Sequence, residues 1–212
     1  MLLEVERKAV VKYANLMLES GLVVGTGGNV SIFNRRKGLL AITPGSRDYM
    51  SLKPEDIIVL EPEGKIIEGE GNPSSELKLH TVFYNNREDI DAVVHTHSFY
   101  SSSLSCMNKG LPAIHYMIAS AGGNISCAPY ASFGTSELAN NALKGMKNRR
   151  AVLLANHGLV SGAGTIDQAY SIASHIEYIS GLYLNCLSSG QDIQILPPEE
   201  VKNLNRQFIG YH

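Results

Sequence analysis

The stretch Ala92-Val93-Val94-His95-Thr96-His97 decides how this sequence is interpreted. Its first three residues are apolar, which predicts a buried strand. Side chains alternate between the two faces of a strand, so His95 and His97 point the same way. Two imidazoles at this spacing can reach one ion at about 2.0–2.1 Å, the usual zinc–nitrogen distance. The stretch therefore predicts part of a metal site at the end of a strand.

A third histidine follows another predicted strand. Residues 151–155 are continuously apolar, and Asn156-His157-Gly158 comes directly after them. Gly158 permits close backbone approach beside His157. Three imidazoles would leave one coordination position open, as in catalytic zinc sites. The residues alone leave the alternative that these are ordinary core or surface histidines. We expect the remaining central histidines to lie elsewhere and to be structural: His80, His115 and His175.

Glu76 is the second candidate. Pro73-Ser74-Ser75 predicts a helix start with a serine at the N-cap, which would place Glu76 in the first helical turn. The ordinary explanation is that the helix dipole favours an acid there. The functional alternative is a general base beside the metal, with its carboxylate in the open coordination position.

Two segments could hold an anion. Thr26-Gly27-Gly28-Asn29 offers backbone amides and small polar side chains, while Ser74 and Ser75 offer hydroxyls near a helix N-terminus. Together they could bind a phosphate. The spacing does not match G-x-G-x-x-G, because Val30 stands where the third glycine would be, and this disfavours a nucleotide-binding fold. The alternative for each glycine is a simple turn.

The rest of the chain predicts helices that cover a mixed sheet. Short turns join several of the expected strands, which argues against a purely parallel sheet. The expected helices are residues 3–19, 75–86, 136–147, 165–186 and a short one from 197, and the expected hairpins pair 30–33 with 39–42 and 57–60 with 65–67. A length of 212 residues suits one large domain.

Composition excludes several classes of function. With 44% hydrophobic and 18% charged residues, the chain is an ordinary globular protein. A net charge of −2 argues against nucleic-acid and anionic-membrane partners. No apolar run approaches the roughly 20 residues of a membrane helix, and we expect no signal peptide. Three cysteines without C-x-x-C spacing suggest reduced thiols in a cytoplasmic protein. A serine-hydrolase elbow, G-x-S-x-G, is missing from the sequence.

At these residues the chain resembles the class II aldolase/epimerase family. The matching segments are Gly25-Thr26-Gly27-Gly28-Asn29-Val30-Ser31, Ile42-Thr43-Pro44, Pro73-Ser74-Ser75-Glu76, Val94-His95-Thr96-His97, Pro112-Ala113-Ile114-His115-Tyr116, Ala128-Pro129-Tyr130-Ala131-Ser132-Phe133-Gly134-Thr135 and His157-Gly158-Leu159. The resemblance covers nearly the whole chain, so residues 1–212 are expected to form one such domain. It implies a three-layer α/β/α domain with a mixed, largely antiparallel sheet. It also implies one Zn²⁺ per subunit and a cytoplasmic homotetramer with active sites between neighbouring subunits.

The resemblance also implies a role for each site residue. His95, His97 and His157 would bind the metal, and Glu76 would be a fourth ligand that leaves when substrate binds and then acts as acid and base. Tyr116 would handle the proton on the aldehyde oxygen in a neighbour's site. Phe133 would reach a neighbour's site as well, and Tyr211 would lie near the aldehyde. The phosphate would meet Thr26, Gly28, Asn29, Thr43, Ser46, Ser74 and Ser75.

One segment departs from the family pattern. The family often has Thr-Pro-Thr-Gly or Thr-Pro-Ser-Gly, whereas Thr43-Pro44-Gly45-Ser46 inverts the last pair. Ser46 could still donate to phosphate, but the path of this loop is left open by the inversion.

The implied reaction is the reversible cleavage of a ketose 1-phosphate, expected to be L-fuculose 1-phosphate, to dihydroxyacetone phosphate and a short aldehyde, L-lactaldehyde. One alternative is a pentulose-5-phosphate 4-epimerase on the same scaffold. Such enzymes resemble Ser-Ser-Asp where this chain has Ser75-Glu76, and they carry an added Asp near residues 120–123. Glu76 and the missing Asp favour the aldolase. The other alternative is a non-catalytic protein that binds zinc or a sugar phosphate.

Overall fold

The computed structural model describes residues 1–210, with side chains described through Phe208. The α-helices are α1 (Glu4–Glu19), α2 (Leu77–Asn86), α3 (Phe99–Cys106), α4 (Ser136–Met146), α5 (Ile166–Ser189) and α6 (Pro198–Gly210). The strands are β1 (Asn29–Asn34), β2 (Leu39–Ile42), β3 (Ile58–Leu60), β4 (Ile66–Glu68), β5 (Ala92–Thr96), β6 (Cys127–Ala128), β7 (Ala151–Leu154) and β8 (Gly158–Ala163). Short 3-10 helices are η1 (Tyr49–Ser51), η2 (Pro54–Asp56) and η3 (Tyr116–Ala121).

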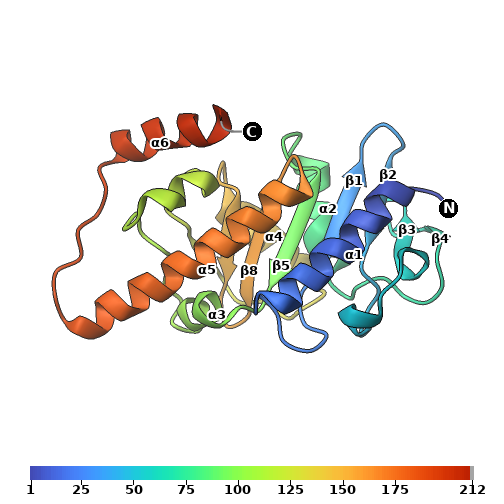
Figure 1. Ribbon diagram of the computed structural model, residues 1–212, viewed down its shortest axis with the longest axis horizontal. Coiled ribbons are helices and arrows are strands. Elements are labelled where there is room, and N and C mark those ends of the chain that lie inside the picture. The colour runs from blue at the N-terminus through green and yellow to red at the C-terminus, as the bar shows by residue number, and fades with distance from the viewer. Residues whose placement is uncertain (211–212) are drawn as a thin grey trace.

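The strands form one sheet in the order β4-β3-β2-β1-β5-β8-β7-β6. Every neighbouring pair is antiparallel except β6 and β7. Alternate residues of β5 enter two separate cores, with Val94 on one face and Val93 on the other. Helices α1, α3 and α5 cover the first face, and α2 and α4 cover the second (Figure 1). The predicted three-layer, largely antiparallel α/β fold is therefore confirmed.

The predicted helices and hairpins are present, with ends that shift by a few residues. Thr165 caps α5 as expected, because its side chain accepts a hydrogen bond from the amide of Gln168 at 3.3 Å. Helix α6 lies against η3 at the end of a long connection from α5 (Figure 1). Among the helices of residues 1–210, none has the length and apolar character needed to cross a bilayer.

The predicted serine N-cap of α2 is wrong. The helix begins at Leu77, and its N-cap is Glu76, whose side chain makes no capping hydrogen bond. Ser74 lies before the helix because its amide donates to the carbonyl of Thr43 at 3.1 Å, which holds residues 73–74 extended beside residues 43–44. The Ser74 hydroxyl instead accepts the amide hydrogen of Glu76 at 3.2 Å. The Glu76 side chain is therefore free to point away from its own helix.

Candidate active site

Three histidines from two chain segments meet at one edge of the sheet. His95 belongs to β5, His97 follows that strand by one residue, and His157 lies in the tight turn between β7 and β8. Because β8 pairs antiparallel with both β5 and β7, the turn is brought beside the end of β5. The ring centroids are 4.7 to 5.0 Å apart. The histidine pair predicted from strand alternation, His95 and His97, therefore lies beside His157, which was predicted from a strand end.

Two glycines permit this close approach. A Cβ atom on Gly158 would lie 2.2 Å from the carbonyl oxygen of Thr96, so only glycine fits between His157 and β5. Gly28 has a positive φ of 71°, and a Cβ atom there would lie 2.6 Å from the carbonyl oxygen of His95. The predicted glycine loop is therefore packed directly on the strand that carries the histidines.

Glu76 completes the cluster. Its Oε2 atom lies 3.1 Å from Nε2 of His95, and its Oε1 atom lies 3.4 Å from Nε2 of His157. Asn29 donates a hydrogen bond from Nδ2 to Oε2 at 3.0 Å. Glu76 is only 5% exposed, and its Oε1 atom is buried without a hydrogen-bond partner among the described residues. A buried carboxylate oxygen that accepts no hydrogen bond keeps the capacity to bind a metal ion or another ligand.

The electrostatics keep two imidazoles neutral. Burial lowers the pKa of His97 to about 3 and that of His157 to about 4, and charge on His95 adds to both shifts. Burial alone would raise the pKa of Glu76, but the charge and hydrogen bond of His95 outweigh it and hold this pKa well below its ordinary value. Burial would lower the pKa of His95, but the neighbouring Glu76 carboxylate raises it.

The group fits a divalent metal ion. Ligand atoms of Glu76, His95, His97 and His157 all lie within 4.8 Å of one another. Nε2 of His95 and Nε2 of His97 face each other at 2.9 Å, and Nδ1 of His95 lies 2.9 Å from the carbonyl oxygen of Leu159. When the proton of His95 is on Nδ1, the Nε2 atom carries a lone pair that faces the cluster. Neutral imidazoles and an ionised carboxylate are the forms in which these residues bind metals.

A cavity of about 690 Å³ opens over this group. Apart from Glu76, His97 and His157, the predicted site residues along its walls are Thr26, Gly28, Asn29, Ser46, Ser74, Ser75 and Phe133. Backbone amides and hydroxyls of the glycine loop and of residues 74–75 thus face one space, as an anion site requires.

Ser46 has a positive φ of 56°, the conformation that glycine adopts readily. The inverted Gly45-Ser46 pair therefore leaves a non-glycine residue in a left-handed position.

Several predicted residues do not have the place that was expected for them. Thr43 is fully buried, and its hydroxyl accepts the amide hydrogen of Val30 at 3.3 Å, so it supports the loop from behind. His95 is also fully buried and reaches the cluster only through its Nε2 atom. Phe133 lines the cavity of its own chain, although the resemblance placed it in a neighbour's site. Tyr211 lies outside the described residues.

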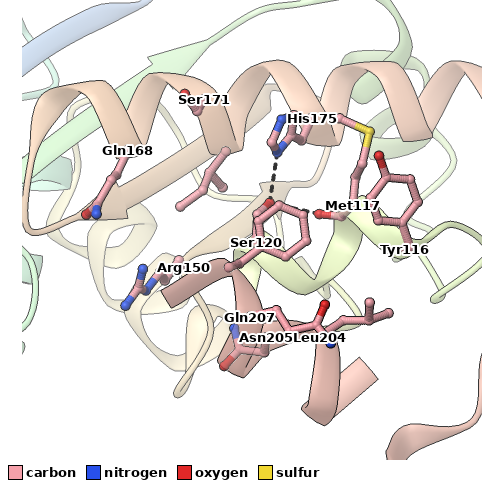
Figure 2. A pocket seen from close by; sticks show the side chains of 12 residues that line it. Tyr116, Met117, Ser120, Arg150, Gln168, Ser171, His175, Leu204, Asn205 and Gln207 are labelled. Atoms are coloured by element: carbon pink, nitrogen blue, oxygen red, sulfur yellow. Dashed lines mark hydrogen bonds between the residues drawn. The ribbon is translucent and has the colours of Figure 1, made fainter. Parts of the chain in front are cut away.

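Tyr116 lines a different cavity. It is 53% exposed on η3 and faces a space of about 640 Å³ between η3, α5 and α6. Figure 2 shows it near Met117 and His175, and its ring stacks on Phe208 at a centroid distance of 6.4 Å. His175 contacts Ser120 at 3.1 Å in the same cavity. A single chain therefore does not bring Tyr116 to the histidine cluster.

The sequence interpretation missed several residues of the site. Tyr130 lines the histidine cavity and is 61% exposed, although it lies in one of the segments that carry the resemblance. Asn72 and Asn156 also line it, next to the predicted residues 73–76 and 157. His80 lies outside the cluster and its cavity, as expected, but its ring contacts the side chain of Asn29 directly behind the cluster, a contact that was not predicted.

Comparison with known proteins agrees with this geometry. The model of the family described as Class II Aldolase and Adducin N-terminal domain matches residues 8–184. The 5-deoxy-D-ribulose 1-phosphate aldolase of Bacillus thuringiensis serovar kurstaki is 50% identical over 211 residues, which cover 100% of this chain and 99% of that protein. The L-fuculose phosphate aldolase of Escherichia coli K12 is 40% identical over 92% of this chain and 90% of that protein. A solved L-fuculose 1-phosphate aldolase superimposes with a TM-score of 0.93 at 43% identity, over 96% of each chain.

The matched region contains all four residues of the histidine and glutamate group, and both the sequence relatives and the solved structure cover nearly the full length of the chain. This chain therefore belongs to the class II aldolase family.

Proposed function

We propose that this protein is a zinc-dependent aldolase that reversibly cleaves a ketose 1-phosphate to dihydroxyacetone phosphate and a short aldehyde. One observation carries the proposal. Glu76 lies between three imidazoles and a cavity that is lined by the hydroxyls and amides of residues 26–29 and 74–75. A phosphate held by those groups would place the adjacent carbons of the sugar beside the carboxylate.

The fit of the four ligands supports a divalent metal at His95, His97 and His157, with Glu76 as a further ligand. When bound, such an ion supplies a Lewis acid that stabilises negative charge on substrate oxygens. Zinc is proposed because three imidazoles and an open position are typical of catalytic zinc sites. A metal at this position would also explain the buried Oε1 atom of Glu76.

Residues of the chain itself would transfer the proton and bind the phosphate. Glu76 would take the C3 proton of dihydroxyacetone phosphate during condensation and return it during cleavage. Burial keeps water away from its carboxylate, since Glu76 is only 5% exposed. Thr26, Asn29, Ser46, Ser74 and Ser75, with the backbone of Gly28, would bind the phosphate. Binding energy at the phosphate would then orient the reacting carbons.

Tyr116 would act from a neighbouring subunit. In cleavage it would remove the proton from the C4 hydroxyl, and in condensation it would return this proton to the aldehyde oxygen. Its exposure on η3, away from the histidine cluster of its own chain, is compatible with such a contact. We therefore include a homotetramer with active sites between subunits in the proposal. We also propose that the protein works in the cytoplasm.

Two ketoses are the leading substrates. The relative that is 50% identical over the full chain is named for 5-deoxy-D-ribulose 1-phosphate, and the Escherichia coli K12 relative that is 40% identical is named for L-fuculose phosphate. Both sugars yield dihydroxyacetone phosphate, and they differ only in the aldehyde, which is acetaldehyde or L-lactaldehyde. We place 5-deoxyribulose 1-phosphate first because of the higher identity and retain L-fuculose 1-phosphate as the second candidate. Tyr130 and Phe133, exposed at the cavity, could face the methyl end of either sugar.

A cleavage assay tests the function. Each of the two ketose 1-phosphates would be offered to metal-free protein and to protein restored with Zn²⁺, and dihydroxyacetone phosphate would be measured by a coupled reduction that consumes NADH. The proposal expects release of dihydroxyacetone phosphate only after metal is restored. The ratio of kcat/KM for the two sugars identifies the better substrate.

The same assay separates the alternatives. A pentulose-5-phosphate 4-epimerase would convert its substrate without release of any triose phosphate. That result would contradict the proposed aldolase activity and favour the epimerase. A non-catalytic binding protein would bind the sugars without turning over either of them. Substitution of Glu76 by glutamine would then change no catalytic property.

A further inference from the structure

A buried hydrogen-bonded chain runs from Glu76 into the interior. Asn29 donates from Nδ2 to Oε2 of Glu76 at 3.0 Å, and its Oδ1 atom contacts Nε2 of His80. On the other side of the ring, Nδ1 of His80 lies 2.6 Å from Oγ of Ser31. Oγ of Ser31 in turn lies 2.5 Å from the hydroxyl of Tyr84. The chain thus joins the carboxylate to helix α2, which carries both His80 and Tyr84.

The ionised carboxylate of Glu76 fixes the direction of the hydrogen bonds from Asn29 to His80. An ionised Glu76 can only accept, so the amide of Asn29 must turn its NH₂ group toward the carboxylate. Its Oδ1 atom then faces His80 and needs a donor, which must be the Nε2–H of that ring. A neutral imidazole with its proton on Nε2 accepts at Nδ1, and the hydroxyl of Ser31 is placed to donate there. If the proton of His80 were on Nδ1, Oδ1 of Asn29 would face a ring nitrogen without a hydrogen. The orientation of the amide that directs Nδ2 toward Glu76 would then lose this stabilising hydrogen bond.

His80 cannot contact a substrate. It is fully buried and is not among the residues that line the histidine cavity, whereas Asn29 lines that cavity. Burial lowers the pKa of His80 to about 3, so the ring is neutral over the range in which an enzyme works. A neutral ring in a closed space can hold one tautomer, and its two partners Asn29 and Ser31 select which one.

We infer that His80 is a positioning residue whose Nε2–H fixes the amide of Asn29, so that this amide orients the carboxylate of Glu76 toward the histidine cluster. The inference rests on the proposed function for its catalytic consequence. Outer partners of this kind affect metal affinity or activity by about 10–100-fold when they are removed. A purely structural role would instead affect activity only as far as it affects folding.

A matched pair of variants separates the two roles. In His80→Gln, the amide nitrogen takes a position near that of Nε2 and can still donate to Asn29. In His80→Asn, the shorter amide reaches the position of Nδ1, keeps a partner in Ser31 and loses the donor to Asn29. Phe83→Leu, a fully buried change on the same helix, supplies a control for lost stability without a polar contact.

Two readouts are measured for each variant of the full-length protein. The first is Co²⁺ affinity, from the absorbance of the metal titrated into metal-free protein. The second is kcat and KM for the better ketose 1-phosphate with metal present. We expect His80→Asn to weaken Co²⁺ binding about tenfold and to lower kcat by about 10–100-fold, with KM changed less than about threefold. We expect His80→Gln to stay within about threefold of the parent in both readouts.

The parent protein gives a test that needs no variant. In the zinc-loaded protein, the ¹⁵N shifts of His80 should report a neutral ring protonated on Nε2 between pH 6 and 8. A proton on Nδ1 would overturn the inference, whatever the variants do. Equal losses in His80→Gln and His80→Asn, or losses in His80→Asn that match Phe83→Leu at the same melting temperature, would overturn it as well. If neither ketose is cleaved but the Co²⁺ pattern holds, the positioning role stands and the proposed function fails.

Discussion

Oε2 of Glu76 lies 3.1 Å from Nε2 of His95, although the two residues come from opposite ends of different elements. Glu76 stands at the start of α2, and His95 stands near the end of β5. The carboxylate of Glu76 is therefore close enough to share a metal with the imidazoles and close enough to the cavity to act on a substrate. The two roles compete for the same oxygens, which makes Glu76 the most informative residue to change.

Substitution Glu76→Gln should remove the acid and base of the reaction while it preserves the size of the side chain. We expect kcat to fall by about 10²–10⁴-fold, the usual contribution of a positioned proton-transfer group. The comparison uses saturating metal, so that weaker metal binding does not account for the loss. Glu88→Gln, in the exposed turn that follows α2, serves as the control and should leave kcat unchanged. Normal turnover by Glu76→Gln would exclude Glu76 as the base.

Removal of the metal should abolish cleavage and destabilise the protein. A ligand at 100 times its Kd stabilises the folded state by about 2.7 kcal/mol, and for a chain of this size that corresponds to a rise of about 5–10 °C in Tm. Calorimetry with and without Zn²⁺ measures this rise. In His97→Asn, which has lost one imidazole, the rise should be much smaller. An identical rise in both proteins would mean that the ion binds elsewhere.

Acid should destabilise the metal-free protein before its exposed carboxylates titrate. Burial holds the pKa of His80 and His97 at about 3 and that of His157 at about 4, whereas these groups titrate near 6.5 in an unfolded chain. Between about pH 6.5 and 4, the unfolded chain therefore binds more protons, and stability falls as the pH falls. His95, whose pKa is raised beside Glu76, acts in the opposite sense only at about pH 6.5 and above, so it does not offset these protons in the acid range.

Urea unfolding of the metal-free protein at several pH values checks this trend. Each net proton changes the free energy of unfolding by up to about 1.4 kcal/mol per pH unit. The three protons of His80, His97 and His157 give a clear decrease in the urea midpoint from pH 6.5 to 4.5. A midpoint that stays constant over this range would show that the three imidazoles titrate normally in the folded chain.

Local sequence was sufficient for the core of the site. The alternation in residues 92–97 places His95 and His97 on one face, and the apolar run 151–154 places His157 at a strand end. The two segments meet through β8, a strand that was not predicted because Gly158, Ser161 and Gly162 interrupt its apolar pattern. Close packing against neighbouring residues explains why small residues stand there. A Cβ atom on Gly162, for example, would lie 3.0 Å from the side chain of Ile90.

Long-range contacts account for the rest. Helix α3 was not predicted, and its sequence Phe-Tyr-Ser-Ser-Ser-Leu-Ser-Cys has little helix propensity. Its N-terminus is stabilised by Glu177 of α5, which accepts hydrogen bonds from the amides of Tyr100 and Ser101 and from the hydroxyl of Ser98. The contact of His80 with Asn29 was likewise not predicted, because it joins residues of α2 and β1 that are 51 positions apart in the sequence. No local pattern contains either relationship.

The inverted loop pair offers a test of strain. Ser46 has a φ of 56°, which costs a residue with a Cβ atom roughly 1–2 kcal/mol. A Cβ atom on Gly45 would lie 3.4 Å from the carbonyl oxygen of Pro73, an ordinary contact. The double variant Gly45→Ser/Ser46→Gly, which restores the usual order, should therefore be at least as stable as the parent in thermal unfolding. Ser46→Val should lose about 1–2 kcal/mol, since a β-branched residue is least tolerated there. Destabilisation of the double variant would show that the loop does not have this conformation.

Tyr116 gives the sharpest test of a shared active site. If each site combines Glu76 of one subunit with Tyr116 of its neighbour, Glu76→Gln and Tyr116→Phe should each be nearly inactive alone. Co-expressed with different affinity tags and purified as mixed oligomers, they should regain activity. In a random mixture, a site keeps Glu76 in half of the cases and a neighbour with Tyr116 in half of those, so about a quarter of the sites are intact in a cyclic oligomer. Mixed oligomers with no more activity than the separate variants would show that the two residues do not combine across subunits. An active Tyr116→Phe protein would remove Tyr116 from the mechanism.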